Sequence, residues 1–370
     1  MAIINRLCLM RNITGKLTPE LLKHTNPQSV GKDDGYKIVS FRELVEQVAN
    51  LSYLNKDFLL FFRGQKNDYR NSNRNSTFYP TIYRSDYLTQ SELDFRFEKL
   101  SSASKILVSL LRKNKINGIT EIERKKYIQW SILQHYEVTE TPFIDVTQSL
   151  RVACSFAQLN NEKENAFIYV FGLPYFTNRI SINSEHDLIN IRLLSISPPQ
   201  ALRPYFQEGY LIGTDDVVND YSNKSELDLN NRLIAKFEIP NTDKFWGKDF
   251  NRIPESALYP PNDTIQSICK EIQVEVQTEL TSSNIGNYIK MWTEFEHKII
   301  LKAKHFIRDT HTLNQAIYVL LKYEPDKSYI YSEIDNLRKF RNKLVHKPFS
   351  VTNEDVKKMN INLAQILDRI

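Results

Sequence analysis

An arginine near residue 63 is placed where it could hold an anion. Arg63 stands near the end of the apolar segment Asp57–Gln65, which predicts a buried strand that stops at Gly64. A guanidinium at the end of a buried strand costs free energy unless an anion or a carbonyl group faces it. Arg63 could hold a phosphate or ribose from this rigid support. Alternatively, a buried carboxylate such as Asp145 could hold Arg63, and the residue types leave both alternatives open.

A second group of residues with suitable chemistry, Arg341, Asn342 and His346, stands near the C-terminus. The apolar residues around them recur at helical spacing and predict a helix over 328–346. Five residues along an α-helix are about 140° apart, so Arg341 and His346 of one chain converge poorly. Two chains packed across these helices would bring two such pairs into one cleft. The spacing therefore favours a homodimer through the C-terminal helices.

Strand and helix patterns alternate over residues 36–280 and predict an α+β domain with a mixed sheet. Ser40 and Glu43 have the spacing of a capping box at the start of a helix over 40–51. Residues 1–35 are predicted to be irregular. The other helices are predicted at 91–113, 120–134, 148–159 and 264–278. The other strands are predicted at 141–149, 166–173, 189–196, 209–213 and 232–239.

Strand patterns disappear after about residue 284. Four amphipathic segments follow, at 285–308, 311–323, 328–346 and 353–369. Short connections between successive helices favour antiparallel packing. The sequence thus predicts an all-α four-helix bundle over 285–370.

Four blocks in the first domain resemble the FRG domain family, which is named for a Phe-Arg-Gly motif. They cover residues 57–213 in the family's order and lie at Phe61–Gln65, Thr77–Arg84, Leu133–Ala157 and Arg203–Gly213. The chain departs from the pattern in three places. Glu137 replaces a small residue, Val146 stands where Trp is common, and Leu150 with Arg151 replaces a pair that contains Pro.

This resemblance implies a core like that of ADP-ribosyltransferases, with NAD as the expected cofactor. Arg63, beside Gly64, would hold the ribose or phosphates of NAD, and Thr147 and Ser149 would wall the nicotinamide. A carboxylate would stabilise the positive charge that develops on the ribose. Family members have Gln and Gly in the last block, so a nucleotide bound without turnover is the alternative. The remaining expected site residues are Glu208 or Gln207 for the carboxylate role, and His135 and Tyr136 for the pocket wall.

The segment Ile334–Pro348 resembles the HEPN family, whose ribonuclease members share an Arg-polar-x(3–5)-His motif on a late helix. The resemblance covers about 285–370 and implies metal-independent RNA cleavage by a dimer. Arg341 would clamp the charged phosphorane and His346 would move the proton. Asn342 completes the motif, and Glu296, or else Glu294, would support the site. The alternative is a HEPN-like module that only dimerises.

Charge and composition fit a partner that is nucleic acid. The formal net charge is +5, and residues 285–370 carry 15 Lys and Arg against 10 Asp and Glu, so the whole excess lies there. A basic unit favours RNA as a partner, although a solvated helical surface has the same charge. The three Cys are far apart, which excludes a disulfide scaffold and a Cys-based zinc site. No apolar run is long enough for a membrane span or a signal peptide, so we expect a cytoplasmic protein.

These observations lead to three hypotheses. In the first, the chain is a prokaryotic conflict protein, an anti-phage effector or toxin that cleaves RNA through its HEPN dimer, while the FRG domain senses or modifies a target that bears a nucleotide. In the second, the FRG domain transfers ADP-ribose from NAD and the HEPN unit dimerises. In the third, the protein is a sensor or binding partner without catalysis.

Overall fold

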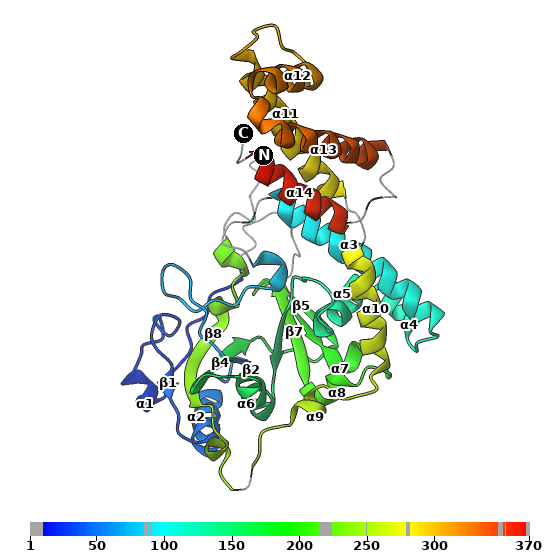
Figure 1. The fold of residues 1–370 in the computed structure, drawn as a ribbon. Coiled ribbons are helices and arrows are strands. Elements are labelled where there is room, and N and C mark those ends of the chain that lie inside the picture. The colour runs from blue at the N-terminus through cyan, green and yellow to red at the C-terminus, as the bar shows by residue number, and fades with distance from the viewer. Residues whose placement is uncertain are drawn as a thin grey trace, which may run out of the picture. The chain divides into compact units, whose positions relative to one another are not determined.

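Contacts within the chain divide it between Ile272 and Gln273, inside helix α10 (Thr264–Thr278), into two units. We call residues 1–272 unit 1 and residues 273–370 unit 2 (Figure 1). The computed structural model describes residues 10–84, 88, 90–214, 224–248, 250–278, 282–346, 351 and 353–367.

Unit 1 is built around a mixed sheet of eight strands in its described residues, in the order β1-β8-β4-β2-β3-β7-β6-β5. Neighbouring strands are antiparallel except β1 and β8, which are parallel. This arrangement confirms the predicted α+β class. The strands are β1 (Tyr36–Lys37), β2 (Leu59–Gln65), β3 (Ile144–Thr147), β4 (Asn165–Leu173), β5 (Ile180–Asn183), β6 (Leu188–Arg192), β7 (Gly209–Thr214) and β8 (Leu233–Pro240).

The pairing between β2 and β3 is the weakest point of the sheet. Strand β2 pairs along its whole length with β4 but meets β3 at one residue pair, Phe62 with Thr147. Beyond that pair the two strands separate. The sheet therefore consists of two four-stranded halves, and the functional residues described below lie where these halves part.

Helix α6 (Leu150–Gln158) packs on β2, β3 and β4. It begins at Ser149, whose hydroxyl accepts a hydrogen bond from the backbone N–H of Val152. Its small residues allow the close approach to the sheet that their spacing predicts: a Cβ added to Gly64 would lie 1.9 Å from the carbonyl oxygen of Ala153. A glycine is therefore required at this point of β2.

The remaining helices of unit 1 border the sheet (Figure 1). The predicted cap of α2 is confirmed at Ser40, whose hydroxyl accepts from the N–H of Glu43 at 3.3 Å, whereas the Glu43 carboxylate accepts from the N–H of Val39 and not of Ser40. Leu17 and Leu21 are buried in the main core, so the described part of residues 1–35 packs with the sheet. These helices are α1 (Pro19–Leu22), α2 (Phe41–Leu54), α3 (Gln90–Lys113), α4 (Ile119–Arg124), α5 (Lys126–His135), α7 (Leu193–Ile196), α8 (Arg203–Gln207) and α9 (Glu255–Leu258).

One predicted strand is wrong in its second half. The apolar segment at 189–196 was expected to be extended throughout, but the chain leaves β6 after Arg192 and forms the short helix α7. An apolar run alone does not distinguish a buried strand from a buried helical turn. Leu193 and Ile196 are buried in either case.

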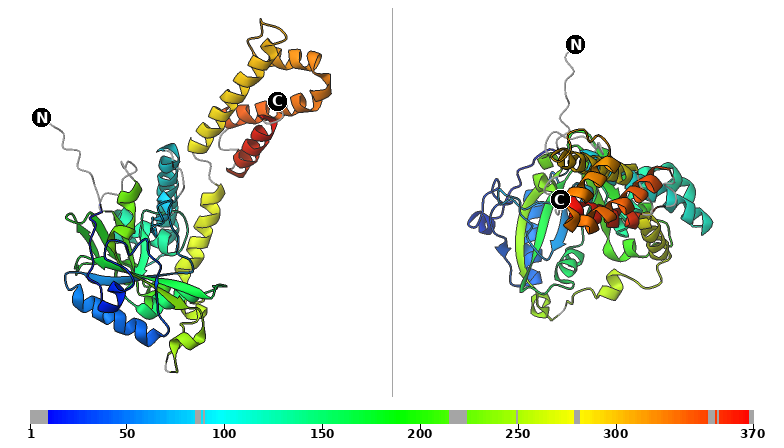
Figure 2. Two further views of the ribbon diagram at one scale, coloured as in Figure 1. Left: turned by 90° about the vertical axis from the view of Figure 1, so that its left-hand side faces the viewer. Right: turned by 45° about the horizontal axis from the view of Figure 1, so that its top comes forward.

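Besides the end of α10, unit 2 contains four α-helices in its described residues: α11 (Ser282–Lys304), α12 (Leu313–Tyr323), α13 (Ser328–His346) and α14 (Asn353–Leu367). Helix α11 contacts the other three (Figure 2), and Trp292, Phe295, Leu320 and Leu337 are among the side chains that form their common core. The helices coincide closely with the four amphipathic segments. No described helix of either unit is both long and apolar enough to cross a lipid bilayer.

Candidate functional site

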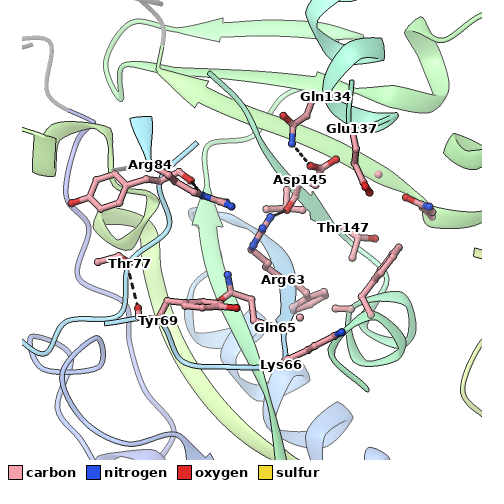
Figure 3. A pocket seen from close by; sticks show the side chains of 18 of the residues that line it. Arg63, Gln65, Lys66, Tyr69, Thr77, Arg84, Gln134, Glu137, Asp145 and Thr147 are labelled. Carbon is pink, nitrogen blue, oxygen red and sulfur yellow. Dashed lines mark hydrogen bonds between the residues drawn. The ribbon is translucent and has the colours of Figure 1, made fainter. Parts of the chain in front are cut away.

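A pocket of about 1270 Å³ lies in unit 1 beside the junction of β2 and β3 (Figure 3). Residues Phe62–Gln65 line it from β2, with Lys66 just after that strand, Asp145–Thr147 from β3, and Val152, Ala153 and Phe156 from α6. Side chains from α5, α8 and the loop after β2 complete the walls. The pocket thus combines residues that are far apart in the sequence, on supports fixed by sheet pairing.

Arg63 follows Phe62, the residue of β2 that pairs with β3, and its side chain reaches the backbone of β3. Its Nη1 donates to the backbone carbonyl oxygen of Asp145 at 2.5 Å, and its buried Nε has no partner among the described residues. Burial and the nearby positive charge of Arg84 lower the pKa of Arg63 to about 10, against the opposing charge of Asp145. The guanidinium stays charged at neutral pH. Arg63 is therefore held by a carbonyl group rather than by a carboxylate.

Positive charge dominates the pocket. Six cationic side chains line it, against the two carboxylates of Asp145 and Glu137. Arg70 is neutralised by Asp34 and Asp68, at 2.8 and 2.7 Å. The six are Arg63, Lys66, Arg70, Arg84, Arg203 and Lys224.

Arg84 is a second guanidinium that lines the pocket near Arg63. Its Nε donates to the carbonyl oxygen of Tyr79 at 2.9 Å, and no ion pair with a described carboxylate holds it. Burial lowers its pKa and the charge of Asp145 raises it, with a net lowering. Two guanidiniums, each bonded to a carbonyl group, therefore face one space.

Asp145 carries the carboxylate that the pocket presents. Its Oδ2 accepts from the Gln134 side-chain amide at 2.6 Å, and its Oδ1 lies 3.4 Å from Nδ1 of His135. Burial raises the pKa of Asp145, but the hydrogen bonds from His135 and Gln134 and the charge of Arg63 hold it below its usual value. The side chain is 41% exposed, while that of His135 is 4% exposed. The carboxylate is thus ionised, supported from behind and open to the pocket.

Five of the predicted cofactor-binding residues line this pocket: Arg63, Gly64, His135, Thr147 and Gln207. The Thr147 hydroxyl donates to the Glu208 carbonyl oxygen at 3.1 Å and accepts from the Ser149 N–H. The Gln207 amide donates to the Leu258 carbonyl oxygen at 2.8 Å. Both polar side chains therefore also hold the chain in shape.

Three other predicted residues do not line the pocket. Ser149 caps α6. Tyr136 is buried, and its hydroxyl donates to Asp263 at 2.7 Å. Burial and this hydrogen bond raise the pKa of Tyr136. Glu208, expected on a strand, ends α8 in a left-handed conformation (φ 46°) with its side chain exposed. The structure thus does not bring the Glu208 carboxylate to this pocket, and Asp145 stands there instead.

The departure from the family pattern at Glu137 has a structural counterpart. Glu137 has φ 57°, in the left-handed region that favours glycine. A glycine would adopt this conformation without the strain that a Cβ introduces. In this chain the turn places a second carboxylate on the pocket wall.

Sequence reasoning did not select several lining residues. Arg84 and Arg203 end and begin two blocks of the FRG resemblance, so their position in the pattern was the available indication. Tyr69 lies in a polar loop without periodicity, and Phe156 and Tyr259 have spacing typical of core residues. The aromatic residues that line the pocket are Phe62, Tyr69, Tyr79, Phe156 and Tyr259.

The predicted residues of unit 2 lie on α13 and α11. Arg341 is half-buried, its Nη1 donates to Oδ1 of Asn342 at 3.1 Å, and its Nε is buried without a partner among the described residues. His346 is exposed at the end of α13, and Glu296 is half-buried on α11. No hydrogen bond or ion pair joins Glu296 or His346 to Arg341 in the described structure. The structure thus brings only Arg341 and Asn342 into contact.

Comparison with known families confirms part of the expected resemblance. The family model of the FRG domain matches residues 59–166, from β2 through α6 to the start of β4. Unit 1 is therefore an α+β unit that contains an FRG domain. No curated protein and no solved structure matches the chain. No group of three or more His, Cys, Asp or Glu residues in the described parts of the chain is arranged to hold a metal ion.

Proposed function

We propose that unit 1 binds a nucleotide through its phosphates in the pocket beside β2 and β3. The observation that carries this proposal is the pair of guanidiniums, Arg63 and Arg84. Each donates to a backbone carbonyl group, and burial together with the charge of Arg84 lowers the pKa of Arg63. A phosphate between them would relieve this repulsion and accept charge-assisted hydrogen bonds from both.

The rest of the pocket supports a nucleotide rather than a small inorganic anion. Its volume of about 1270 Å³ exceeds what a phosphate fills. Tyr69, Phe156 and Tyr259 offer aromatic faces on which a base or nicotinamide ring could stack. A pyrophosphate-bearing nucleotide such as ADP or NAD matches both the cations and the rings.

Binding of ADP, NAD and pyrophosphate to the full chain by titration calorimetry tests this proposal. Arg84→Gln should lower the affinity for all three ligands by at least about tenfold, the equivalent of one lost charge-assisted hydrogen bond. Arg42→Gln is the matched control, because Arg42 is 90% exposed on α2, outside the pocket lining, and pairs with Glu46. Absence of binding by the unaltered protein, or equal affinities in the two variants, would contradict the proposal.

NAD-dependent ADP-ribosyl transfer by this pocket is a further step that we keep as an alternative. Arg63 and Thr147 line the pocket as that reaction would need, but Glu208 does not. This arrangement favours binding without turnover, as in a sensor. Labelled NAD decides between the two: release of nicotinamide with label on an acceptor, lost in Arg63→Ala, would support transfer. Intact NAD would support the sensor.

RNA cleavage by a homodimer of unit 2 is our second candidate function, and a role as a cytoplasmic conflict protein that restricts phage or cell growth goes with it. The observation that favours it is the partly buried Arg341 with an unpartnered Nε on the same helix as the exposed His346. In such a dimer, Arg341 would hold the phosphate and His346 would transfer the proton from the 2′-hydroxyl.

The test compares two exposed histidines of unit 2. His346→Ala should abolish cleavage of RNA and toxicity to cells. His311→Ala should leave both unchanged, since His311 is 67% exposed before α12 and contacts Asp309. Full toxicity of the His346 variant would exclude this ribonuclease function.

A further inference from the structure

We propose that Asp145 selects ligands with a ribose diol, so that the pocket distinguishes ribonucleotides from their deoxy analogues. This inference rests on the proposed nucleotide-binding function and names the chemistry that the carboxylate recognises. It assigns to Asp145 a direct contact with the ligand. The residues that hold Asp145 in place are positioning residues.

The carboxylate of Asp145 is fixed by donors on one side only. The Gln134 amide donates to Oδ2 at 2.6 Å and His135 Nδ1 lies 3.4 Å from Oδ1. The amide of Gln134 is oriented in turn, since its oxygen accepts from the hydroxyl of the fully buried Thr141. The carbonyl group of His135 accepts from Nη1 of Arg203 at 3.0 Å.

The other side of the carboxylate is available to a ligand. An ionised carboxylate has about four acceptor positions, of which Gln134 and His135 take two. No Lys or Arg side chain of the described residues forms an ion pair with it. The side chain is 41% exposed and faces the pocket (Figure 3). The unused acceptor positions therefore require hydrogen-bond donors from the ligand or from water.

The neighbouring cation sets where those donors must be. Arg63 donates to the backbone carbonyl oxygen of the same residue, Asp145, so the guanidinium and the carboxylate are held in one rigid arrangement. A ligand that places phosphate on Arg63 must present neutral donors to Asp145, because a second anionic group would be repelled. The 2′- and 3′-hydroxyls of ribose are neutral, adjacent donors close to the 5′-phosphate of a nucleotide. Inorganic pyrophosphate and dideoxynucleotides lack them.

The size of the effect follows from the charge on the acceptor. A hydrogen bond to a charged group contributes roughly 1.5–3 kcal/mol, which corresponds to an affinity ratio of about tenfold to a hundredfold. A site built to pair with hydroxyl groups rejects analogues without them, because its own polar group is then left unpaired.

Titration of the full chain with ADP, 2′,3′-dideoxy-ADP and pyrophosphate tests the inference. The unaltered protein should bind ADP about tenfold to a hundredfold more tightly than the dideoxy analogue. In Asp145→Asn, the affinity for ADP should fall toward the affinity for the dideoxy analogue. Pyrophosphate should bind the variant at least as tightly as before, since a negative charge has been removed. Asp57→Asn, at an exposed residue outside the pocket, is the matched control.

The outcomes separate this inference from the proposal beneath it. Equal binding of ADP and dideoxy-ADP by the unaltered protein would overturn the inference and leave phosphate binding intact. The comparison of the two ligands needs no variant, so it stands even if Asp145→Asn fails to fold. A loss of pyrophosphate and ADP binding alike in a folded Asp145→Asn would show a structural role and overturn the inference. Failure of all three ligands to bind the unaltered protein would overturn both.

Discussion

Arg63 in unit 1 and Arg341 in unit 2 are both partly buried arginines whose Nε has no partner within the part of the chain that the structure describes. Arg63 bonds to a strand 82 residues away in the sequence, in a pocket that several elements build. Arg341 bonds to the next residue on its own helix. A sheet can gather side chains from distant segments, whereas a single helix face presents only its own. The ribonuclease site proposed for unit 2 would therefore depend on a second surface, as the expected dimer would supply.

The ion pairs of the two units differ in the same way. Lys236 in unit 1 is buried and lies 3.1 Å from Asp68, which also accepts from the hydroxyls of Ser76 and Tyr169. Lys339 in unit 2 is 71% exposed and lies 2.8 Å from Asp335 on the same helix. The first pair anchors the loop that forms the pocket wall. The second pair lies on a solvated surface.

The largest expected difference between the units concerns these lysines. Lys236→Met removes one charged partner of the buried Asp68 carboxylate, while Arg70, Ser76 and Tyr169 remain, and should lower the free energy of unfolding by about 3 kcal/mol. Lys339→Met should shift the urea midpoint only slightly, because exposed pairs contribute little. Urea denaturation followed by circular dichroism measures both. A Lys236 variant as stable as the unaltered protein would contradict the structural role of this pair.

Glycine substitutions should give a second difference in stability between the units. Gly64→Ala puts a methyl group 1.9 Å from the Ala153 carbonyl oxygen and should cost about 3 kcal/mol, as overpacking does. Gly286→Ala, on the exposed side of α11 with open space around it, should stabilise unit 2 by about 0.5–1 kcal/mol. Thermal unfolding of the two variants gives the comparison. A neutral Gly64→Ala would mean that α6 can move away from β2.

The pH dependence of stability should have opposite signs in the two units. Burial raises the pKa of Asp228 to about 6, against hydrogen bonds from Asn230 and Phe78. Its stabilising contribution is therefore full below pH 3.8 and is lost as pH rises through about 6. Asp228→Asn removes this loss, so the variant should gain about 2 kcal/mol relative to the unaltered protein between pH 4 and pH 7.

The opposite case in unit 2 is Asp335. Hydrogen bonds from Lys339, chiefly, and the charges of Lys339 and Arg338 lower its pKa. Its contribution is present above pH 3.8 and is lost as pH falls through the lowered value. Asp335→Asn should therefore lose stability relative to the unaltered protein on going from pH 3 to pH 7. Urea titrations at several pH values reveal both trends, and parallel trends would contradict the assignments.

The smallest expected effects come from helix caps. Ser149→Ala removes the cap of α6, and Thr312→Ala removes the capping box of α12. Each should cost about 1 kcal/mol of stability. Because Ser149 lies outside the pocket lining, its variant should keep the nucleotide affinity of the unaltered protein. A large loss of affinity without a loss of stability would restore the role at the nicotinamide that the family resemblance implied.

The elements that the sequence predicts best are those determined by residues close together in the chain. The helices of unit 2 follow from apolar spacing, and the start of α2 follows from Ser40. Arg63 could be singled out because a charge at the end of an apolar strand is unusual. The FRG resemblance added His135, Thr147 and Gln207. Arg84 reaches the pocket from a loop, where no periodicity indicates which way a side chain faces.

The errors have a common physical cause. The family resemblance implied a strand carboxylate at Glu208, but the strand begins at Gly209, and the left-handed conformation of Glu208 turns its side chain outward. Tyr136 stands next to His135 in the sequence, but its hydroxyl meets Asp263 from the other end of unit 1. Such tertiary partners, 127 residues apart, are not visible in local patterns.

The single pairing of β2 with β3, between Phe62 and Thr147, has a mechanical consequence. Residues on both sides of this joint face the pocket, so an occupant that touches Arg63 and Asp145 would crosslink the two halves of the sheet. Amide protons of β3 and β7 would then exchange with solvent more slowly, although the occupant touches only one edge of their half. Occupancy of the pocket would in this way be transmitted to the far strands β5 and β6 as a change in stiffness rather than in shape.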